Sequence, residues 1–328
     1  MMKKTMITGL WVMLLTSLLT LPAFAQELIV GGQAVGIQIR TDGVLVAGLC
    51  EVDGSGARPA ETAGLKTGDR IVAADGVPVA DAASLMQAIE AGEGGVTLQV
   101  QRGERSLQVT VEPALSGEGR PMLGLLLRDG LSGIGTLTFC DPDSGVFGAL
   151  GHSINDTTTG LAVPVRDGSI TDAQIVSVTP GAAGAPGELD GCADLGRVLG
   201  EITRNSDAGI FGLSTESFGG KRLETGELTA GPASIVSTVS GHEAREYAVE
   251  INRVYREAGG THAMLSVTDA ELLAKTGGIV QGMSGSPILQ NGKLVGAVTH
   301  VFVSDPRRGY AVSIQDMLRA AGAMDLAA

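Results

Sequence analysis

The chain has 328 residues, enough for two domains of ordinary size. Its 49 glycines and only 3% aromatic residues favour many short strands and turns over long helices, with cores of Val, Ile, Leu and Ala. The formal net charge of −13 argues against nucleic acid as a partner, because there is no basic patch to neutralise phosphate groups. The cysteines, Cys50, Cys140 and Cys192, are spaced irregularly and no Cys/His cluster suggests zinc, so we expect small buried side chains and neither a metal nor a cofactor.

The first 25 residues have the pattern of an export signal. Two lysines give a basic start, residues 10–21 form an uncharged apolar run, and Ala23-Phe24-Ala25 supplies the small residues that a signal peptidase reads. Two outcomes stay open: a cleaved signal that leaves Gln26 as the mature start, and a retained anchor that ties the protein to the membrane by this segment alone. Both predict a protein exported across the cytoplasmic membrane.

Residues 28–115 have the pattern of one small domain of strands and short helices. Two strands joined by an Asp-Gly turn precede a helix over 82–91, which places Leu85 and Ile89 on one face. Together with the block Ala-Gly-Leu-Lys-Thr-Gly-Asp-Arg-Ile at 63–71, this pattern resembles the PDZ domains of bacterial proteases. The resemblance implies an α+β fold, a small partly open barrel, that binds an extended peptide as an added strand.

The same resemblance places a peptide-binding groove between the strand at 36–39 and the helix face that carries Leu85 and Ile89. The loop that binds the peptide carboxylate is expected at Val35-Gly36-Ile37. The ligand would be a peptide of another protein or a segment of this chain itself. A purely structural domain that positions its neighbour stays open as the alternative.

Residues 116–121 have the composition of a linker, with Gly117, Gly119 and Pro121 among charged residues. The residues from 122 to 322 form a second domain of short β-type runs, with a closing helix over 314–321. Strands are expected over 135–139, 175–178, 233–239, 247–254 and 294–300. Strands and helices do not alternate here, so the sequence predicts a mainly β barrel or sandwich.

The most informative segment is Gly282-Met283-Ser284-Gly285-Ser286-Pro287. A serine between glycines, with a proline just after, presents its hydroxyl on a tight turn. Trypsin-like peptidases build their nucleophile and oxyanion hole on the pattern Gly-x-Ser-Gly-x-Pro, which predicts Ser284 as nucleophile and the backbone N–H groups of Gly282 and Ser284 as oxyanion donors. Ser286 is the rival nucleophile, but a residue before proline is held extended, away from the tip of the turn.

A serine hydroxyl is a poor nucleophile without an adjacent base. His152 ends an apolar run that a glycine interrupts, which suits a strand end that projects an imidazole into a cleft. His242 and His262 lie in polar turns and are expected at the surface, whereas His300 ends a strand and could lie near the site. We therefore predict His152 as the general base.

Both segments resemble the SpoIVB peptidase family. The match covers Gly148 to Ile154 around the histidine and Thr276 to Ile288 around the serine, and it continues through Asn291 to Val303 and Asp305-Pro306. The order of export segment, PDZ domain and peptidase domain also fits the family. The resemblance implies a trypsin-like β-barrel serine peptidase domain, with the serine and the histidine named above as nucleophile and base.

The third member of the triad has two candidates. The family's pattern points to the aspartate fifteen residues before the nucleophile, Asp269, while Asp156 follows His152 by four residues. Asp269 also precedes Ala-Glu-Leu-Leu, so a helix N-cap is its alternative role. A triad acid accepts the imidazole Nδ1–H and stabilises the imidazolium, and we predict Asp269 in that role.

The resemblance implies a serine endopeptidase of a spore-forming bacterium that cleaves itself and acts in the space between mother cell and forespore. There it would cleave a membrane-associated regulatory protein, so that a membrane-embedded protease complex begins to process a sigma-factor precursor. Its partners would be that substrate, the peptide in the PDZ groove and the protease complex. Two other kinds of function stay open: a proteolytically inactive PDZ scaffold, and a serine hydrolase with a non-protein substrate.

Overall fold

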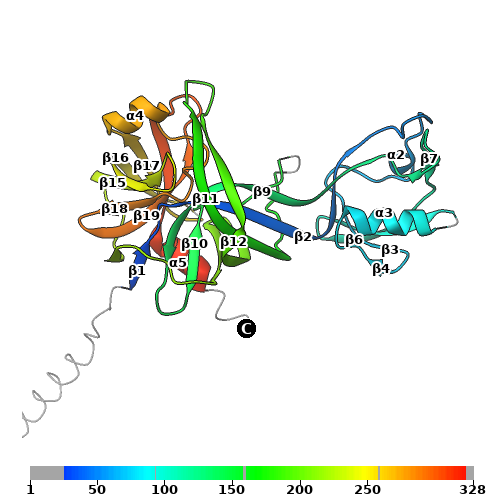
Figure 1. Ribbon diagram of the computed structural model, residues 1–328, viewed down its shortest axis with the longest axis horizontal. Coiled ribbons are helices and arrows are strands. Elements are labelled where there is room, and N and C mark those ends of the chain that lie inside the picture. The colour runs from blue at the N-terminus through cyan, green and yellow to red at the C-terminus, as the bar shows by residue number, and fades with distance from the viewer. Residues whose placement is uncertain (1–25, 93, 158–159, 258, 323–328) are drawn as a thin grey trace, which may run out of the picture.

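The computed structural model describes residues 26–92, 94–157, 160–257 and 259–322, so the predicted export signal at 1–25 lies outside the described residues. Within these ranges, no helix has the length and apolar character needed to cross a membrane. The described residues are mainly β, as the composition predicted, and they form two barrels with a small α+β unit standing apart at one end (Figure 1).

The first barrel is an antiparallel ring in the order β9-β10-β13-β12-β11-β2, closed where β2 pairs back onto β9. Its strands are β2 (Ala34–Leu49), β9 (Leu125–Cys140), β10 (Val146–Ala149), β11 (Asp167–Thr179), β12 (Glu188–Ser206) and β13 (Gly209–Ser214). Two short strands, β1 (Glu27–Val30) and β14 (Arg222–Glu224), extend the sheet beside β9. Alternate side chains of a strand face the same side, so Val35, Ile37, Leu137 and Phe147 meet in the core.

The second barrel is closed in the order β15-β16-β17-β20-β19-β18. Its strands are β15 (Gly231–Thr238), β16 (Ala244–Glu257), β17 (Gly260–Val267), β18 (Pro287–Gln290), β19 (Lys293–Val301) and β20 (Arg308–Ser313). α4 (Ala270–Thr276) follows β17, and α5 (Ile314–Gly322) follows β20. The apolar face of α5, with Ile314 and Met317, joins one buried cluster with Phe139 and Phe211 of the first barrel, so this cluster fixes the two barrels side by side.

The small α+β unit is an excursion of the chain between β2 and β9. Both strands run without interruption from the first barrel into this unit, where they begin a sheet in the order β9-β2-β3-β5-β6 (Figure 1). Its other elements are α2 (Pro59–Thr62), β3 (Arg70–Ala74), β4 (Val77–Pro78), α3 (Ala82–Ala91), β5 (Val96–Arg102), β6 (Arg105–Val111), β7 (Ala114–Leu115) and β8 (Pro121–Met122). A capping box between Asp81 and Ser84 starts α3, which buries Leu85 and Ile89.

Most of the predicted elements are confirmed, since the expected strands fall in β9, β11, β15, β16 and β19 and the closing helix is α5. The residues predicted as a linker, 116–121, lie in the hairpin β7–β8. Its turn is formed by residues 116–120, in which the Ser116 N–H donates to the Arg120 carbonyl at 2.8 Å. The expectation of buried cysteines holds for Cys140, while Cys50 is half-buried and Cys192 is exposed.

Candidate active site

The turn Gly282–Pro287 precedes β18 of the second barrel and is held in place by β9 of the first. The Thr136 N–H donates to the Ser284 carbonyl at 3.0 Å, and the Thr136 hydroxyl donates to the Gly282 carbonyl at 2.8 Å. Gly285 has φ +95°, and a Cβ there would lie 2.1 Å from the Thr136 carbonyl oxygen, so only glycine fits. The serine is therefore fixed at the boundary between the barrels.

The N–H groups of the turn differ in whether they have a partner. The Met283 N–H donates to the Val280 carbonyl at 3.1 Å, and the Gly285 N–H donates to the Val298 carbonyl at 2.7 Å. Among the residues that the structure describes, the N–H groups of Gly282 and Ser284 have no hydrogen-bond partner. They are thus available for an anionic oxygen, which is the role predicted for them.

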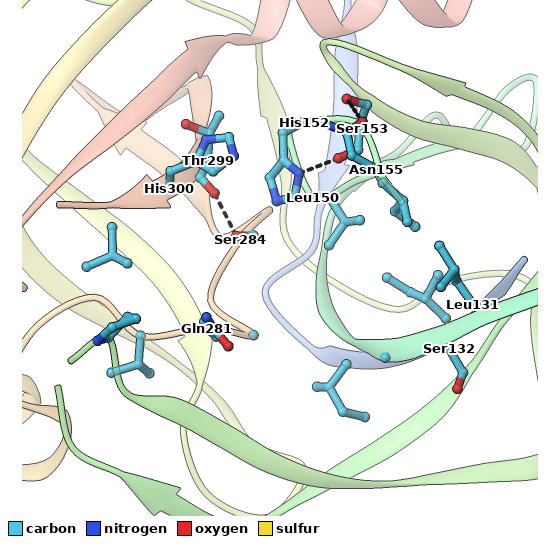
Figure 2. A pocket seen from close by; sticks show the side chains of 18 of the residues that line it. Leu131, Ser132, Leu150, His152, Ser153, Asn155, Gln281, Ser284, Thr299 and His300 are labelled. Carbon is cyan, nitrogen blue, oxygen red and sulfur yellow. Dashed lines mark hydrogen bonds between the residues drawn. The ribbon is translucent and has the colours of Figure 1, made fainter. Parts of the chain in front are cut away.

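His152 follows β10 of the first barrel through a tight turn, in which Leu150 has φ +68° and Gly151 φ +70°. Its ring lines the same pocket as Ser284 (Figure 2). Nδ1 lies 2.8 Å from the Ser153 carbonyl oxygen, which can only accept, so Nδ1 carries the proton and Nε2 is the acceptor. Burial lowers the pKa of His152 below its usual range, which keeps the ring neutral as a base must be.

The Ser284 hydroxyl donates to the Thr299 carbonyl at 2.6 Å and not to His152 (Figure 2). The Ser284 hydroxyl can leave the Thr299 carbonyl by a rotation about its Cα–Cβ bond, because a serine side chain has three staggered rotamers. Catalytic hydrogen bonds are often formed only when substrate is bound, so the arrangement is compatible with a nucleophile and its base.

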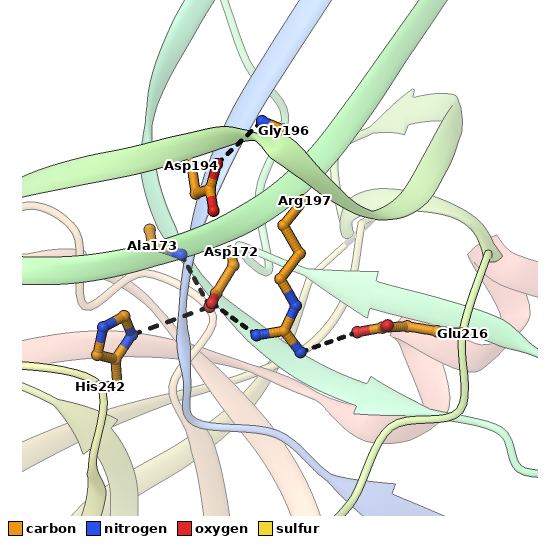
Figure 3. Close-up of polar contacts among 7 residues, drawn as sticks. All are labelled: Asp172, Ala173, Asp194, Gly196, Arg197, Glu216 and His242. Atoms are coloured by element: carbon orange, nitrogen blue, oxygen red, sulfur yellow. Dashed lines mark hydrogen bonds and ion pairs between the residues drawn. The ribbon is translucent and has the colours of Figure 1, made fainter.

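His300 is the second imidazole of the pocket, close to the site as the sequence suggested. Its ring centroid lies 4.4 Å from that of His152. Although His300 keeps an exposed edge, desolvation and the proximity of His152 lower its pKa to about 4, so it stays neutral at neutral pH. The two other histidines lie elsewhere. His262 faces Tyr255, and His242 lies 4.0 Å from Asp172 in a surface cluster (Figure 3).

The structure brings neither candidate acid into contact with His152. Asp269 is the N-cap of α4, where its carboxylate accepts the Leu272 N–H at 2.9 Å and the Ala248 N–H at 3.3 Å. Asp156 is buried and pairs with Arg128 at 3.1 Å. In the structure Asp269 therefore has its alternative role, the helix cap, and the Nδ1–H of His152 is bonded to the Ser153 carbonyl instead.

The rival nucleophile Ser286 is fully buried and donates to the Met283 carbonyl at 2.7 Å. The positioning roles of Thr136, Thr299 and the Ser153 carbonyl escaped the sequence analysis. Two of these act through the main chain, which carries no residue-specific signal. Thr136 falls in a predicted strand, and its role in holding the serine turn becomes visible only when the two barrels are packed together.

The structure leaves no room for a peptide groove at the predicted place. Residues 35–37 are in the barrel half of β2, paired with β9 on one side and β11 on the other, so no peptide can add there. Leu85 and Ile89 belong to the core of the small unit. The edge that stays unpaired next to α3 is the start of β9, Leu125–Arg128, which pairs with β2 only. An Asp129 oxygen accepts the Ala82 N–H at 3.0 Å, which ties this strand to the first residue of α3.

Comparison with known proteins agrees with this architecture. Residues 119–318 match the family model described as SpoIVB peptidase S55, and residues 35–112 match that of the PDZ domain. A 75-residue stretch, 22% of the chain, is 41% identical to a putative serine protease HhoA of Synechocystis sp. and spans 18% of that protein.

Two solved structures overlap with the chain more loosely. The Rv3671c protease from M. tuberculosis in its active form is 14% identical, over 58% of this chain and 75% of that one, with a TM-score of 0.35. The thermostable serine protease AL20 from an extremophilic microorganism is 10% identical, over 60% of this chain and 92% of that one, with a TM-score of 0.36. Neither is close enough to transfer a residue role. The family model covers most of both barrels, and the chain therefore belongs to the SpoIVB peptidase S55 family of serine peptidases and carries a PDZ domain.

Proposed function

We propose that the chain is an exported serine endopeptidase in which Ser284 attacks the scissile carbonyl and His152 is the general base. The observation that carries this proposal is the meeting of both side chains in one pocket, each from a different barrel. Two further features support it: a neutral His152 whose Nε2 is the acceptor, and two unpartnered N–H groups on the serine turn.

In the proposed reaction, the Ser284 hydroxyl leaves the Thr299 carbonyl, turns to Nε2 of His152 and transfers its proton there as Oγ bonds to the substrate carbon. The carbonyl oxygen becomes an anion that accepts hydrogen bonds from the N–H groups of Gly282 and Ser284. Removing one such donor typically lowers kcat by about 10²–10³-fold. The imidazolium then gives its proton to the leaving amine, and the same histidine activates the water that hydrolyses the acyl-enzyme.

The Ser153 carbonyl orients the His152 ring, as the triad acid does in other serine peptidases. It accepts the Nδ1–H of His152 at 2.8 Å and so selects the tautomer with a free Nε2. A carbonyl dipole stabilises the imidazolium less than a carboxylate does. The proposed centre is therefore a dyad with an orienting main-chain group.

We further propose that a peptide bound beside Leu125–Arg128 in the PDZ domain influences the catalytic histidine. Arg128 is the last residue of this segment, and its partner Asp156 lies on the loop that starts at His152. This contact provides a direct physical connection from the peptide edge to the catalytic loop. Membership of the SpoIVB family supports the finer proposals: self-cleavage, action in sporulation between mother cell and forespore, and cleavage of a membrane-associated regulator upstream of a membrane-embedded protease.

The test compares the purified wild type with Ser284→Ala, using a fluorophosphonate probe and mass spectrometry of intact protein and added peptides. We expect the wild type to be labelled at Ser284 and to cleave, and the variant to do neither while keeping the circular dichroism of the wild type. Ser286→Ala is the matched control and should still be labelled. Undiminished cleavage by a folded Ser284→Ala variant would refute the assignment, and a wild type that neither reacts nor cleaves would favour an inactive scaffold.

A further inference from the structure

The pocket that holds Ser284 and His152 is apolar. It has a volume of about 480 Å³, and no Asp, Glu, Lys or Arg of the described residues lines it. Val280, Val301, Val303 and Pro186 line it together with residues of the first barrel such as Leu131 and Ile154. His152 and His300 are its titratable side chains among the described residues, and the lowered pKa of each keeps both neutral.

The hydrogen-bonding groups beside Ser284 define how a peptide would lie. The scissile carbonyl oxygen must face the N–H groups of Gly282 and Ser284. The Thr299 carbonyl, which now accepts the Ser284 hydroxyl, faces the same space and becomes free when the serine turns to His152. It is placed to accept the main-chain N–H of the residue that supplies the scissile carbonyl.

The side chain of that residue then meets the wall made by the segments on either side of the serine turn. Val280 precedes the turn, and Val301 and Val303 follow Thr299 along β19 and beyond it. The wall ends where the Gly184 N–H, at the tip of the β11–β12 hairpin, donates to the Val303 carbonyl at 2.8 Å. Pro186 of the same hairpin tip also lines the pocket. This part of the pocket is therefore lined by aliphatic groups.

Physical chemistry restricts what such a subsite accepts. A charged side chain would lose part of its hydration there and find no opposite charge, which disfavours Lys, Arg, Asp and Glu. An aliphatic side chain gains from leaving water, and one methylene more or less in an apolar pocket changes kcat/KM by about 10–200-fold.

We propose that the protein cleaves on the carboxyl side of aliphatic residues (Leu, Ile, Val or Met) and that Val301 and Val303 determine this specificity. The proposal rests on the function proposed above, since it names the substrate class of the same site. It adds a preference for an aliphatic residue on the acyl side of the scissile bond. It assigns that preference to Val301 and Val303, which are distinct from the reacting groups.

The first experiment profiles cleavage sites by mass spectrometry in a peptide mixture of natural composition, with Ser284→Ala as the blank. Sites that depend on Ser284 should carry an aliphatic residue on the acyl side. Matched peptides that differ only there should give kcat/KM at least about 100-fold higher for Leu than for Lys or Asp. Ser284-dependent cleavage that ignores this residue, or that selects an apolar residue only on the leaving side, would overturn the inference and leave the proposed peptidase intact. Absence of any Ser284-dependent cleavage would instead contradict the function itself.

The second experiment reverses the preference. Val301→Asp places a carboxylate in the wall and should lower kcat/KM for the Leu peptide while raising it for the Lys peptide, each by about 10-fold or more. Val303→Asp is the second variant, because Val303 is 53% exposed and tolerates a polar group without loss of fold. Val176→Asp, at a 67% exposed valine outside the pocket, is the matched control and should leave the ratio unchanged. Folded Val301→Asp and Val303→Asp variants with the wild-type ratio would refute the assignment of this wall.

Discussion

Replacing Asp269 by Asn separates a helix cap from a catalytic acid. In the structure, one carboxylate oxygen of Asp269 accepts the Leu272 N–H at 2.9 Å and the other accepts the Ala248 N–H at 3.3 Å. Asn keeps one acceptor and is as good an N-cap as Asp, but it loses the longer bond and the negative charge at the start of α4. We therefore expect a small loss of stability and almost no loss of activity.

The magnitudes of the two roles differ widely. Loss of the charge at a helix start costs about 0.3–1 kcal/mol, and complete loss of an N-cap, as in Asp269→Ala, costs about 0.5–2 kcal/mol. For a domain of this size, about 1 kcal/mol lowers the Tm by roughly 2–4 °C. An Asp→Asn change in a true triad lowers kcat by about 10⁴, because the imidazole takes the wrong tautomer.

The assay measures kcat/KM on a peptide substrate together with the Tm of wild type, Asp269→Asn and Asp269→Ala. We expect kcat/KM of the Asn variant within a few-fold of the wild type, and a lower Tm for the Ala variant than for the Asn variant. A fall of about 10⁴ in kcat for Asp269→Asn at unchanged Tm would refute the dyad and restore Asp269 as the acid.

Two further predictions concern pH and the link between the domains. Because burial lowers the pKa of His152, the acid limb of kcat/KM should fall below pH 6.5, and a limb above that value would contradict the assignment of the base. The pKa of His300 is about 4 in the folded protein and 6.5 in the unfolded chain, so the unfolded state binds a proton at the higher pH. The Tm should therefore drop as the pH falls from about 6.5 to 4. In the His300→Gln variant this drop should be less steep. Arg128→Ala removes the ion pair with the buried Asp156 and should cost about 1–3 kcal/mol, below the value for a fully buried pair because the Arg128 side chain is 36% exposed. The exposed Arg120→Ala, whose partner Glu118 is 3.7 Å away, is its control, and equal Tm values for both variants would show that the Arg128 pair does not stabilise the junction.

Several features of the protein follow from local sequence. The serine turn is recognisable because two glycines with positive φ and a following proline leave the backbone few other conformations. The helix α3 and the short strands follow from capping residues and alternating apolar positions, which act within a few residues of one another. His152 could be found in the same way, as the polar residue at the end of an interrupted apolar run.

Other features depend on which strands pair, and local pattern does not specify that. Residues 34–40 have the pattern of a strand, but only the pairing with β9 and β11 shows that they belong to the barrel and not to a peptide groove. The unpaired edge next to α3 lies instead at the start of β9, within one long strand that serves both domains. Asp269 has the spacing of the family's acid, yet the fold uses it to start α4.

The sequence by itself determined the nucleophile turn, the candidate base and the presence of two kinds of domain, because each depends on residues that are neighbours in the chain. Only the tertiary structure decided what surrounds them: Thr136 holding the turn, the Ser153 carbonyl orienting His152, and an aliphatic wall beside Ser284. The physical reason is that these contacts join strands of different barrels, or run through backbone groups that every residue has in common.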